Sequence, residues 1–220
     1  MEENFLDKWC DKIWLIVLYA VGIVMFVVTV VKWNNWSAPE RLMAILTVLL
    51  PIHVFEENTF PGGFPYMNNI AAKSTNPMLY PQNKLTNMVT NLGGEMYIIL
   101  LLLITHLAPK SMAILTAAFG ISQLIMHTRC GVIAFQKYKA TGKRTIYGPG
   151  TISTIALVIL SIVSIQWILT QTMAVTDILL GIGIIVSVVV GFILLPLRIS
   201  AIKRNKRFAL TDIGYFEKFQ

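Results

Sequence analysis

Three side chains that can bind a metal ion or transfer a proton lie close together in the stretch PIHVFEENTFPGGF, residues 51–64. Glu56 follows His53 by three positions and Glu57 follows it by four, so on a helix all three flank one surface. An imidazole with paired carboxylates suits metal binding and general acid–base catalysis. The apolar run RLMAILTVLL directly precedes this stretch. The chemistry would therefore take place at the end of a membrane-type helix.

The composition predicts a membrane protein. Of the 220 residues, 55% are hydrophobic and 13% are charged, which is more apolar surface than one soluble core can bury. Several apolar runs reach the roughly 20 residues that cross a hydrocarbon core of about 30 Å. We expect one all-α domain (1–220), a bundle of about six transmembrane helices that crosses the cell membrane several times. The predicted spans are 13–33, 40–57, 85–107, 111–135, 150–170 and 177–197, and a loop at 58–84 is expected to fold back on the bundle.

The positions of the lysines and arginines predict the orientation. Of the 18, all but Lys32, Arg41 and Lys110 fall on the side that carries both termini, and such an excess marks the cytoplasmic side. The basic stretch RISAIKRNKR follows the last span, where it is typical of contact with anionic headgroups, and the aromatic tail TDIGYFEKFQ is expected to rest on the membrane surface. Despite the net charge of +7, this placement argues against nucleic-acid binding.

Three predicted helices carry ionisable groups at one depth. With a rise of 1.5 Å per residue, His53 and Glu57 lie about 20–25 Å below the outer face, Glu95 about 20 Å and His127 about 24 Å. Of the eleven acidic residues, only these two glutamates and Glu56 lie at membrane depth. Ionisable groups inside a membrane are costly and usually functional. The sequence therefore predicts one polar site in the cytoplasmic-leaflet half.

A stripe of amides belongs to the same prediction. Asn83, Asn87, Asn91 and Glu95 recur every four residues, which places them along one side of a helix. Such a stripe cannot face lipid and must face the bundle interior or a water-filled cavity. On the fourth span, Gln123 precedes His127 by about one helical turn.

The predicted site combines metal ligands, catalytic groups and substrate-binding groups. Two imidazoles and a carboxylate suit a divalent ion such as Zn, Mn or Fe. The alternative is a network that only holds helices together, but serine or asparagine would serve that purpose at lower cost. We predict metal ligands His53, Glu57 and His127; catalytic groups Glu56, Glu57, Glu95 and His127; and substrate-binding groups Asn87, Asn91, Gln123, Arg129 and Tyr147.

A known family shares these motifs. The chain combines HVFEE, FPGGF, a histidine late in a following helix, and YGPG before another apolar span. In this combination it resembles the HXXEE family of bacterial membrane proteins over roughly residues 40–170. The resemblance implies a shared site but no reaction, because the family is named for its motif. The matching positions are His53, Glu56, Glu57, Pro61, Gly62, Gly63, Phe64, His127, Tyr147, Pro149 and Gly150.

Two kinds of chemistry fit the predicted site. A metal-bound water with a glutamate base could hydrolyse an ester, amide or peptide bond. Without a metal, a glutamate base with His127 as acid could catalyse hydrolysis or rearrangement, with Asn91 stabilising an oxyanion. The sequence HVFEE, residues 53–57, differs from the zinc signature H-x-x-E-H, because Glu57 stands at the position of the second histidine. His127 would have to replace it, since His106 is predicted at the outer end of the third span.

A carrier or binding protein is the alternative to an enzyme. A proton-coupled carrier uses the same groups inside the membrane, but no inverted repeat is evident and the outer halves, as in LLLLIT, are apolar. This one-sided polarity favours a membrane-embedded enzyme acting on a lipid-like or membrane-borne substrate. The alternative is a non-catalytic binding, immunity or transport protein with a buried His/Glu ligand or proton site.

Overall fold

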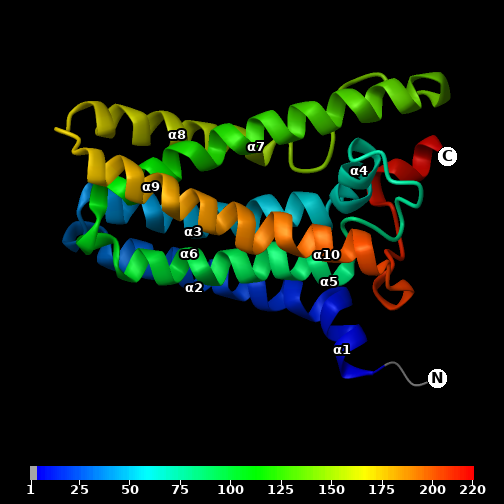
Figure 1. Ribbon diagram of the computed structural model, residues 1–220, viewed down its shortest axis with the longest axis horizontal. Helices are drawn as coiled ribbons and strands as arrows, with labels where there is room; N and C mark the ends of the chain where they lie inside the picture. Colours follow the sequence, from blue (N-terminus) through cyan, green and yellow to red (C-terminus); the bar gives the residue numbers. More distant parts are fainter. Residues whose placement is uncertain (1–3) are drawn as a thin grey trace.

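The protein is helical, and its long helices lie side by side along one axis (Figure 1). The computed structural model describes residues 4–220, and these residues form no strand. Three π-helical segments, η1, η3 and η6, interrupt the long helices. The elements used below are α1 (Phe5–Lys8), η1 (Trp9–Ile13), α2 (Trp14–Lys32), α3 (Ala38–Asn58), α4 (Phe64–Ala71), α5 (Lys84–Met88), η3 (Val89–Gly93), α6 (Gly94–Leu103), α7 (Pro109–Tyr138), α8 (Ser153–Leu169), α9 (Val175–Val188), η6 (Val189–Leu194), α10 (Leu195–Lys203) and the 3₁₀ segment η8 (Gly214–Phe219).

Five helical stretches are long and apolar enough to cross a membrane, which is compatible with the predicted membrane protein. The predicted span 150–170 corresponds to α8, which is apolar but has only 17 residues. Large apolar side chains such as Ile23, Val31 and Ile159 cover the outer faces, as lipid contact requires. The five stretches are Phe5–Asn35, Ala38–Asn58, Lys84–Leu103, Pro109–Thr141 and Val175–Lys203.

An apolar core and a few buried hydroxyls hold the bundle together. Trp14 and Leu18 of α2 pack with residues of α3, α6, α7 and α8 in one buried cluster. Between α7 and α8, the hydroxyls of Thr116 and Ser164 are 2.9 Å apart, and Ser161 donates to the Thr116 carbonyl at 3.2 Å. Small hydroxyl residues are typical of close helix packing in membranes.

The segment predicted as a loop, 58–84, contains the helix α4. Gly63 has a left-handed φ of 97° before this helix, and Pro65 occupies its first turn, where proline is tolerated. The segment does fold back, and the Asn69 amide bonds the Gln82 main chain in both directions at 2.7 Å. No helix was predicted here from the sequence, because the Pro, Gly and Asn residues of the segment are typical of turns and loops.

The C-terminal segment packs against α4 and α7. Phe216 is fully buried and Phe219 is 9% exposed, in a cluster that includes Met67 of α4 and Ala134 of α7. The backbone N–H of Tyr215 donates to the Gly62 carbonyl at 3.1 Å. The aromatic rings of the tail are thus buried in the protein, because α4 and α7 offer them enough apolar surface; the location of the tail at the membrane surface stays a prediction.

Both ends of the described chain lie at the same end of the molecule (Figure 1). An ion pair connects them, with Arg207 Nε 2.6 Å from Asp7 Oδ1. Nearby, Lys84 Nζ at the start of α5 is 2.6 Å from Asp11 Oδ1. The charged groups of this end thus join the N-terminal helix to both α5 and the C-terminal segment.

Candidate metal site and adjoining cavity

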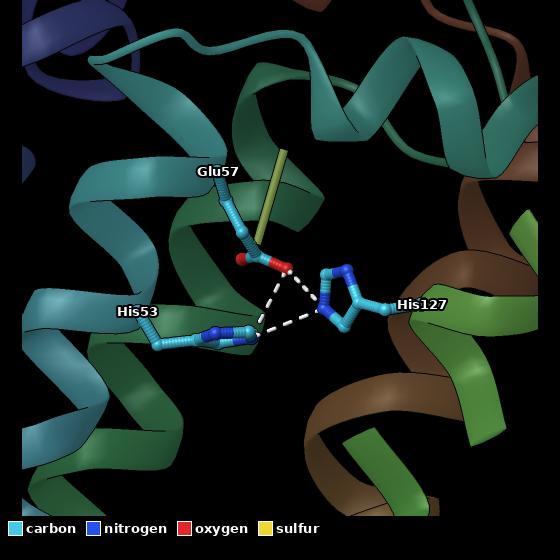
Figure 2. A group of neighbouring side chains, drawn as sticks. All are labelled: His53, Glu57 and His127. Atoms are coloured by element: carbon cyan, nitrogen blue, oxygen red, sulfur yellow. Dashed lines mark hydrogen bonds and ion pairs between the residues drawn. The ribbon is translucent and has the colours of Figure 1, made fainter. Parts of the chain in front are cut away.

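His53, Glu57 and His127 point toward one another inside the bundle (Figure 2). His53 and Glu57 lie one turn apart near the end of α3, and His127 comes from α7. The Nε2 atoms of the two histidines are 3.1 Å apart, and they lie 3.4 Å (His53) and 3.2 Å (His127) from Glu57 Oε1. The three residues are 1–4% exposed. This buried group could hold a metal ion.

The separations within this group match those between ligands of one ion. Tetrahedral ligands about 2.0–2.1 Å from Zn²⁺ lie about 3.3–3.4 Å from one another. Adjacent ligands of an octahedral ion with bonds of about 2.1 Å lie about 3.0 Å apart. The observed 3.1–3.4 Å falls between these values. The residues therefore fit a divalent ion, and their geometry does not distinguish between the two coordination types.

A hydrogen-bond chain fixes the tautomer of His53. The Ser153 hydroxyl lies 2.6 Å from Glu56 Oε2 and 2.9 Å from His53 Nδ1. Since an ionised carboxylate can only accept, we infer that Ser153 donates to Glu56 and accepts from the Nδ1–H of His53. The lone pair of His53 is then on Nε2, directed at the other two ligand atoms. Such outer contacts orient and tune metal-binding histidines.

Glu56 connects α3 to the start of α8. Its two carboxylate oxygens receive bonds from the Tyr147 hydroxyl (3.1 Å), the Ile152 N–H (3.1 Å), and the Ser153 N–H (2.7 Å) and hydroxyl. Burial and the adjacent Glu56 carboxylate raise the pKa of Tyr147, so its hydroxyl stays protonated and donates. Glu56, which is predicted to be catalytic, thus has both oxygens occupied. Sequence reasoning missed Ser153, although it follows the YGPG motif at the start of a span.

The ring of His127 is held by packing on two sides. On one side the Phe64 ring lies 4.7 Å away between centroids. On the other, Gly150 has a φ of 91°, and a Cβ there would lie 2.1 Å from His127 Cε1. A glycine is therefore required for both backbone and space. His127 Nδ1 is buried and has no hydrogen-bond partner within residues 4–220.

A cavity of about 320 Å³ adjoins the three residues His53, Glu57 and His127, which we call the ligand group. Both His53 and Glu57 line this cavity. It lies between α3, α4, the η3–α6 stretch, α7 and the α9–η6–α10 stretch. Most of the other lining side chains are apolar, while Asn68, Gln82, Thr90, Asn91, Ser122 and Gln123 add polar groups. A mostly apolar cavity of this size with a few polar groups is typical of a small-molecule site.

The amides of this region form a buried network. Asn87 accepts bonds from Gln82 Nε2 (3.1 Å) and Asn91 Nδ2 (2.9 Å), and it donates to Asn58 Oδ1. Gln82 also accepts from Asn68 Nδ2 at 2.7 Å. Asn91, Gln82 and Asn68 line the cavity, whereas Asn87 lines a separate pocket of about 70 Å³. Of the predicted asparagines, only Asn91 therefore reaches the cavity beside the ligand group.

The other predicted substrate-binding residues are divided. Gln123 lines the cavity. Arg129 is exposed, with its Nη2 3.3 Å from the Ala71 carbonyl, and Tyr147 is bonded to Glu56. Neither Arg129 nor Tyr147 lines the cavity.

Glu95 lies apart from the ligand group. It is fully buried in α6, and neither carboxylate oxygen has a hydrogen-bond partner among the described residues. Glu95 neither joins the ligand group nor lines the cavity. The π-helical turn η3 falls between Asn87 and Glu95, so the four-residue repeat does not trace the side of a regular α-helix. The structure thus does not bring this predicted catalytic residue to the site.

The chain matches a known protein family. A family model described as a protein of unknown function with HXXEE motif matches residues 44–165. This range includes the three ligand residues, Glu56 and Ser153. No curated protein and no solved structure matches the chain.

Proposed function

Because the chain belongs to the family of proteins of unknown function with the HXXEE motif, we propose its activity from the site itself. The protein is a membrane-embedded enzyme that binds a divalent ion, Zn, Fe or Mn, through His53, Glu57 and His127. It hydrolyses a bond at the polar end of a lipid-like substrate. One observation carries the proposal: three buried ligand atoms lie 3.1–3.4 Å apart beside a cavity.

The donor set favours hydrolysis. Two histidines and one carboxylate with an open position are typical of catalytic zinc, and such an ion polarises a carbonyl or activates water. Within the chain, Ser153 and Glu56 orient His53, and Phe64 and Gly150 orient His127. Glu56, with both oxygens bonded, has a positioning role. Amides that line the cavity are available to bind the polar group of the substrate. These are Asn68, Gln82, Asn91 and Gln123.

We further propose six membrane crossings with both termini in the cytoplasm. The 17 residues of α8 rise about 25 Å, close to the thickness of a hydrocarbon core. The Asp7–Arg207 ion pair keeps the chain ends together, which supports an even number of crossings. The excess of lysine and arginine at this end supports a cytoplasmic location. The site then lies in the cytoplasmic-leaflet half, and the basic C-terminal segment contacts anionic headgroups.

The metal content of purified protein tests the ligand assignment. We expect about one equivalent of metal per chain, and its loss in His53→Gln, Glu57→Gln and His127→Gln, because a site with two of three ligands binds weakly. His106→Gln is the matched control, since His106 is exposed and lies in the short turn that follows the C-terminal end of α6. Elemental analysis, with gel filtration to verify folding, gives the result. Metal-free wild-type protein after growth with Zn, Fe and Mn would refute the proposal.

The hydrolytic activity needs its own measurement. The wild type, Glu57→Gln and His106→Gln would be incubated with a membrane lipid extract, and the products identified by mass spectrometry. We expect the wild type and His106→Gln to release the same product, and Glu57→Gln to release none. A product formed equally by all three proteins would contradict a reaction at this site.

A further inference from the structure

The cavity beside the ligand group opens on the side of the bundle. Figure 1 shows α7 and α9 close together at one end, while α7 and α10 diverge toward the other. Two lining residues are exposed, Ser122 on α7 and Leu194 at the end of η6. The opening therefore lies between α7 and the η6–α10 stretch.

The surface around this opening is apolar. Exposed side chains next to it on α7 are Ile121 (42%) and Ile125 (63%), and on the facing stretch Val190 (46%) and Leu195 (52%). Both helices belong to stretches that can cross a membrane. In a bilayer, hydrocarbon chains therefore have direct access to the opening.

Two π-helical segments form one wall of the cavity. Thr90 and Asn91 belong to η3, and Phe192 belongs to η6. The Thr90 hydroxyl donates to the Phe192 carbonyl at 2.7 Å, and the Phe192 ring packs on Tyr97 with centroids 5.2 Å apart. Widened turns of this kind leave helical bonds to be satisfied elsewhere and frequently lie at functional sites. Here the bond from Thr90 to the Phe192 carbonyl joins the two segments and stabilises the wall.

The cavity contains free space at a glycine. Gly94 is buried in α6 and lines the cavity, and a Cβ built there meets no atom within 4 Å. The volume of about 320 Å³ is near the lower limit of the roughly 300–1,000 Å³ typical of ligand sites. Such a space has room for one hydrocarbon chain and not for a two-chain lipid.

We propose that this cavity binds a single hydrocarbon chain, acyl or prenyl, which enters from the bilayer between α7 and the η6–α10 stretch. The chain lies along the apolar lining and directs its polar end group at His53 and Glu57. The identity of that end group as the reacting group rests on the proposed function. Binding of the chain itself does not require the metal.

Photochemical crosslinking tests the chain site. The full-length protein is reconstituted in phosphatidylcholine vesicles that contain a fatty acid or, in a second sample, a phosphatidylcholine, each with a diazirine near the end of one acyl chain. After illumination, mass spectrometry locates the adducts. We expect adducts of the fatty acid on cavity residues such as Phe119, Met126 and Leu197, and far fewer adducts of the two-chain lipid there; equal adducts from both lipids would contradict a site for a single-chain ligand.

Two variants and one control make the test specific. Gly94→Phe fills the cavity and Ser122→Trp obstructs its mouth, so each should lower adduct formation at cavity residues about tenfold or more. Because Ser122 is exposed, this second variant keeps the test valid even if Gly94→Phe fails to fold. The control is Gly183→Phe, since Gly183 of α9 is exposed and also has no atom within 4 Å of its Cβ position. It should leave the adducts unchanged.

The metal content of the same samples separates this inference from the proposed function. Adducts confined to outer residues such as Ile125 and Ile159, or unaffected by both variants, would overturn the chain site even in metal-loaded protein. Adducts at cavity residues in protein that binds no metal would support the chain site and refute the metal-dependent reaction.

Discussion

Adjacent glutamates at the end of α3 have different surroundings. Glu57 contributes Oε1 to the ligand group, whereas Glu56 accepts bonds from Tyr147, Ile152 and Ser153. The same residue type thus serves two purposes one position apart. Loss of a ligand should abolish metal binding, and loss of an orienting group should only weaken it.

Ser153→Ala tests the orienting role. This variant removes the hydroxyl between Glu56 and His53, so the His53 tautomer is no longer fixed. We expect the metal affinity to fall about 10–100-fold, as is usual for outer-shell partners of metal-binding histidines. A titration with a competing chelator measures this affinity. Ser122→Ala is the control, and an unchanged affinity in Ser153→Ala would show that the serine does not orient the histidine.

Gly150→Ala tests the packing of His127. Gly150 and Gly142 both have positive φ, at 91° and 101°, but only Gly150 is in contact with the histidine ring. The left-handed backbone should cost each alanine variant about 1–2 kcal/mol. Gly150→Ala should in addition displace the ring and lose metal. Thermal unfolding and metal content measure the two effects, and equal metal content in both variants would contradict the packing argument.

The sequence predicts part of the site because depth in a membrane can be counted. A constant rise per residue placed His53, Glu57 and His127 at one level, and the structure brings their side chains together. The same counting predicted Glu95 at the site, but Glu95 neither joins the ligand group nor lines the cavity. Depth gives no information on which side of a helix a residue faces once a π-helical turn intervenes. Ser153 was missed because a lone serine carries no charge pattern.

At the level of elements, the long helices were predictable and the irregular ones were not. The predicted span 177–197 corresponds to the continuous stretch α9–η6–α10, but its composition does not reveal the π-helical turn. Likewise α4 is an eight-residue helix whose position is determined by Gly63 and by burial against α7. Short helices depend on tertiary packing more than on local propensity.

The C-terminal segment covers a buried lysine. Lys143 is 2% exposed, its ammonium donates to the Tyr147 carbonyl, and it lies 4.6 Å from the centroid of the Tyr215 ring. Burial, and secondarily the charge of Lys218, lower the pKa of Lys143 from 10.5 to about 8. Below pH 8 the folded protein must therefore keep a buried charge that the unfolded chain exposes to water.

This predicts a stability that rises with pH. Between pH 8 and about 9.5, below the ordinary pKa of tyrosine of about 10, the folded protein releases the Lys143 proton while the unfolded chain retains it. The free energy of unfolding increases wherever the unfolded state binds more protons. Because the thiols of an unfolded chain also ionise in this range, with an ordinary pKa of about 8.5, the test uses protein in which Cys10 and Cys130 are replaced by serine. Thermal melts of this protein should show the rise, and Lys143→Met in the same background should lose it. Lys139→Met, at an exposed position, should retain it, and a flat profile in the serine background would contradict the prediction.

At the scale of the whole molecule, several features gather at one end. The two ends of the described residues 4–220, the Asp7–Arg207 pair, α4 and the C-terminal segment all lie there (Figure 1). Glu57 is one residue before the end of α3, so the ligand group lies near this end. A site near one face with a lateral opening suits a substrate that stays in one leaflet.

The orientation of the molecule in the membrane can be tested by cysteine labelling. Replacing the buried Cys10 and Cys130 with serine gives a background without cysteines, into which Asn34→Cys and Lys206→Cys are introduced separately. Both positions are exposed, at opposite ends of the bundle. We expect a membrane-impermeant maleimide to label Asn34→Cys on intact cells, and Lys206→Cys only after permeabilisation, because the basic end faces the cytoplasm. The reverse labelling pattern would place the ligand group in the outer leaflet. Labelling of both positions on intact cells would instead contradict a membrane-spanning bundle between them.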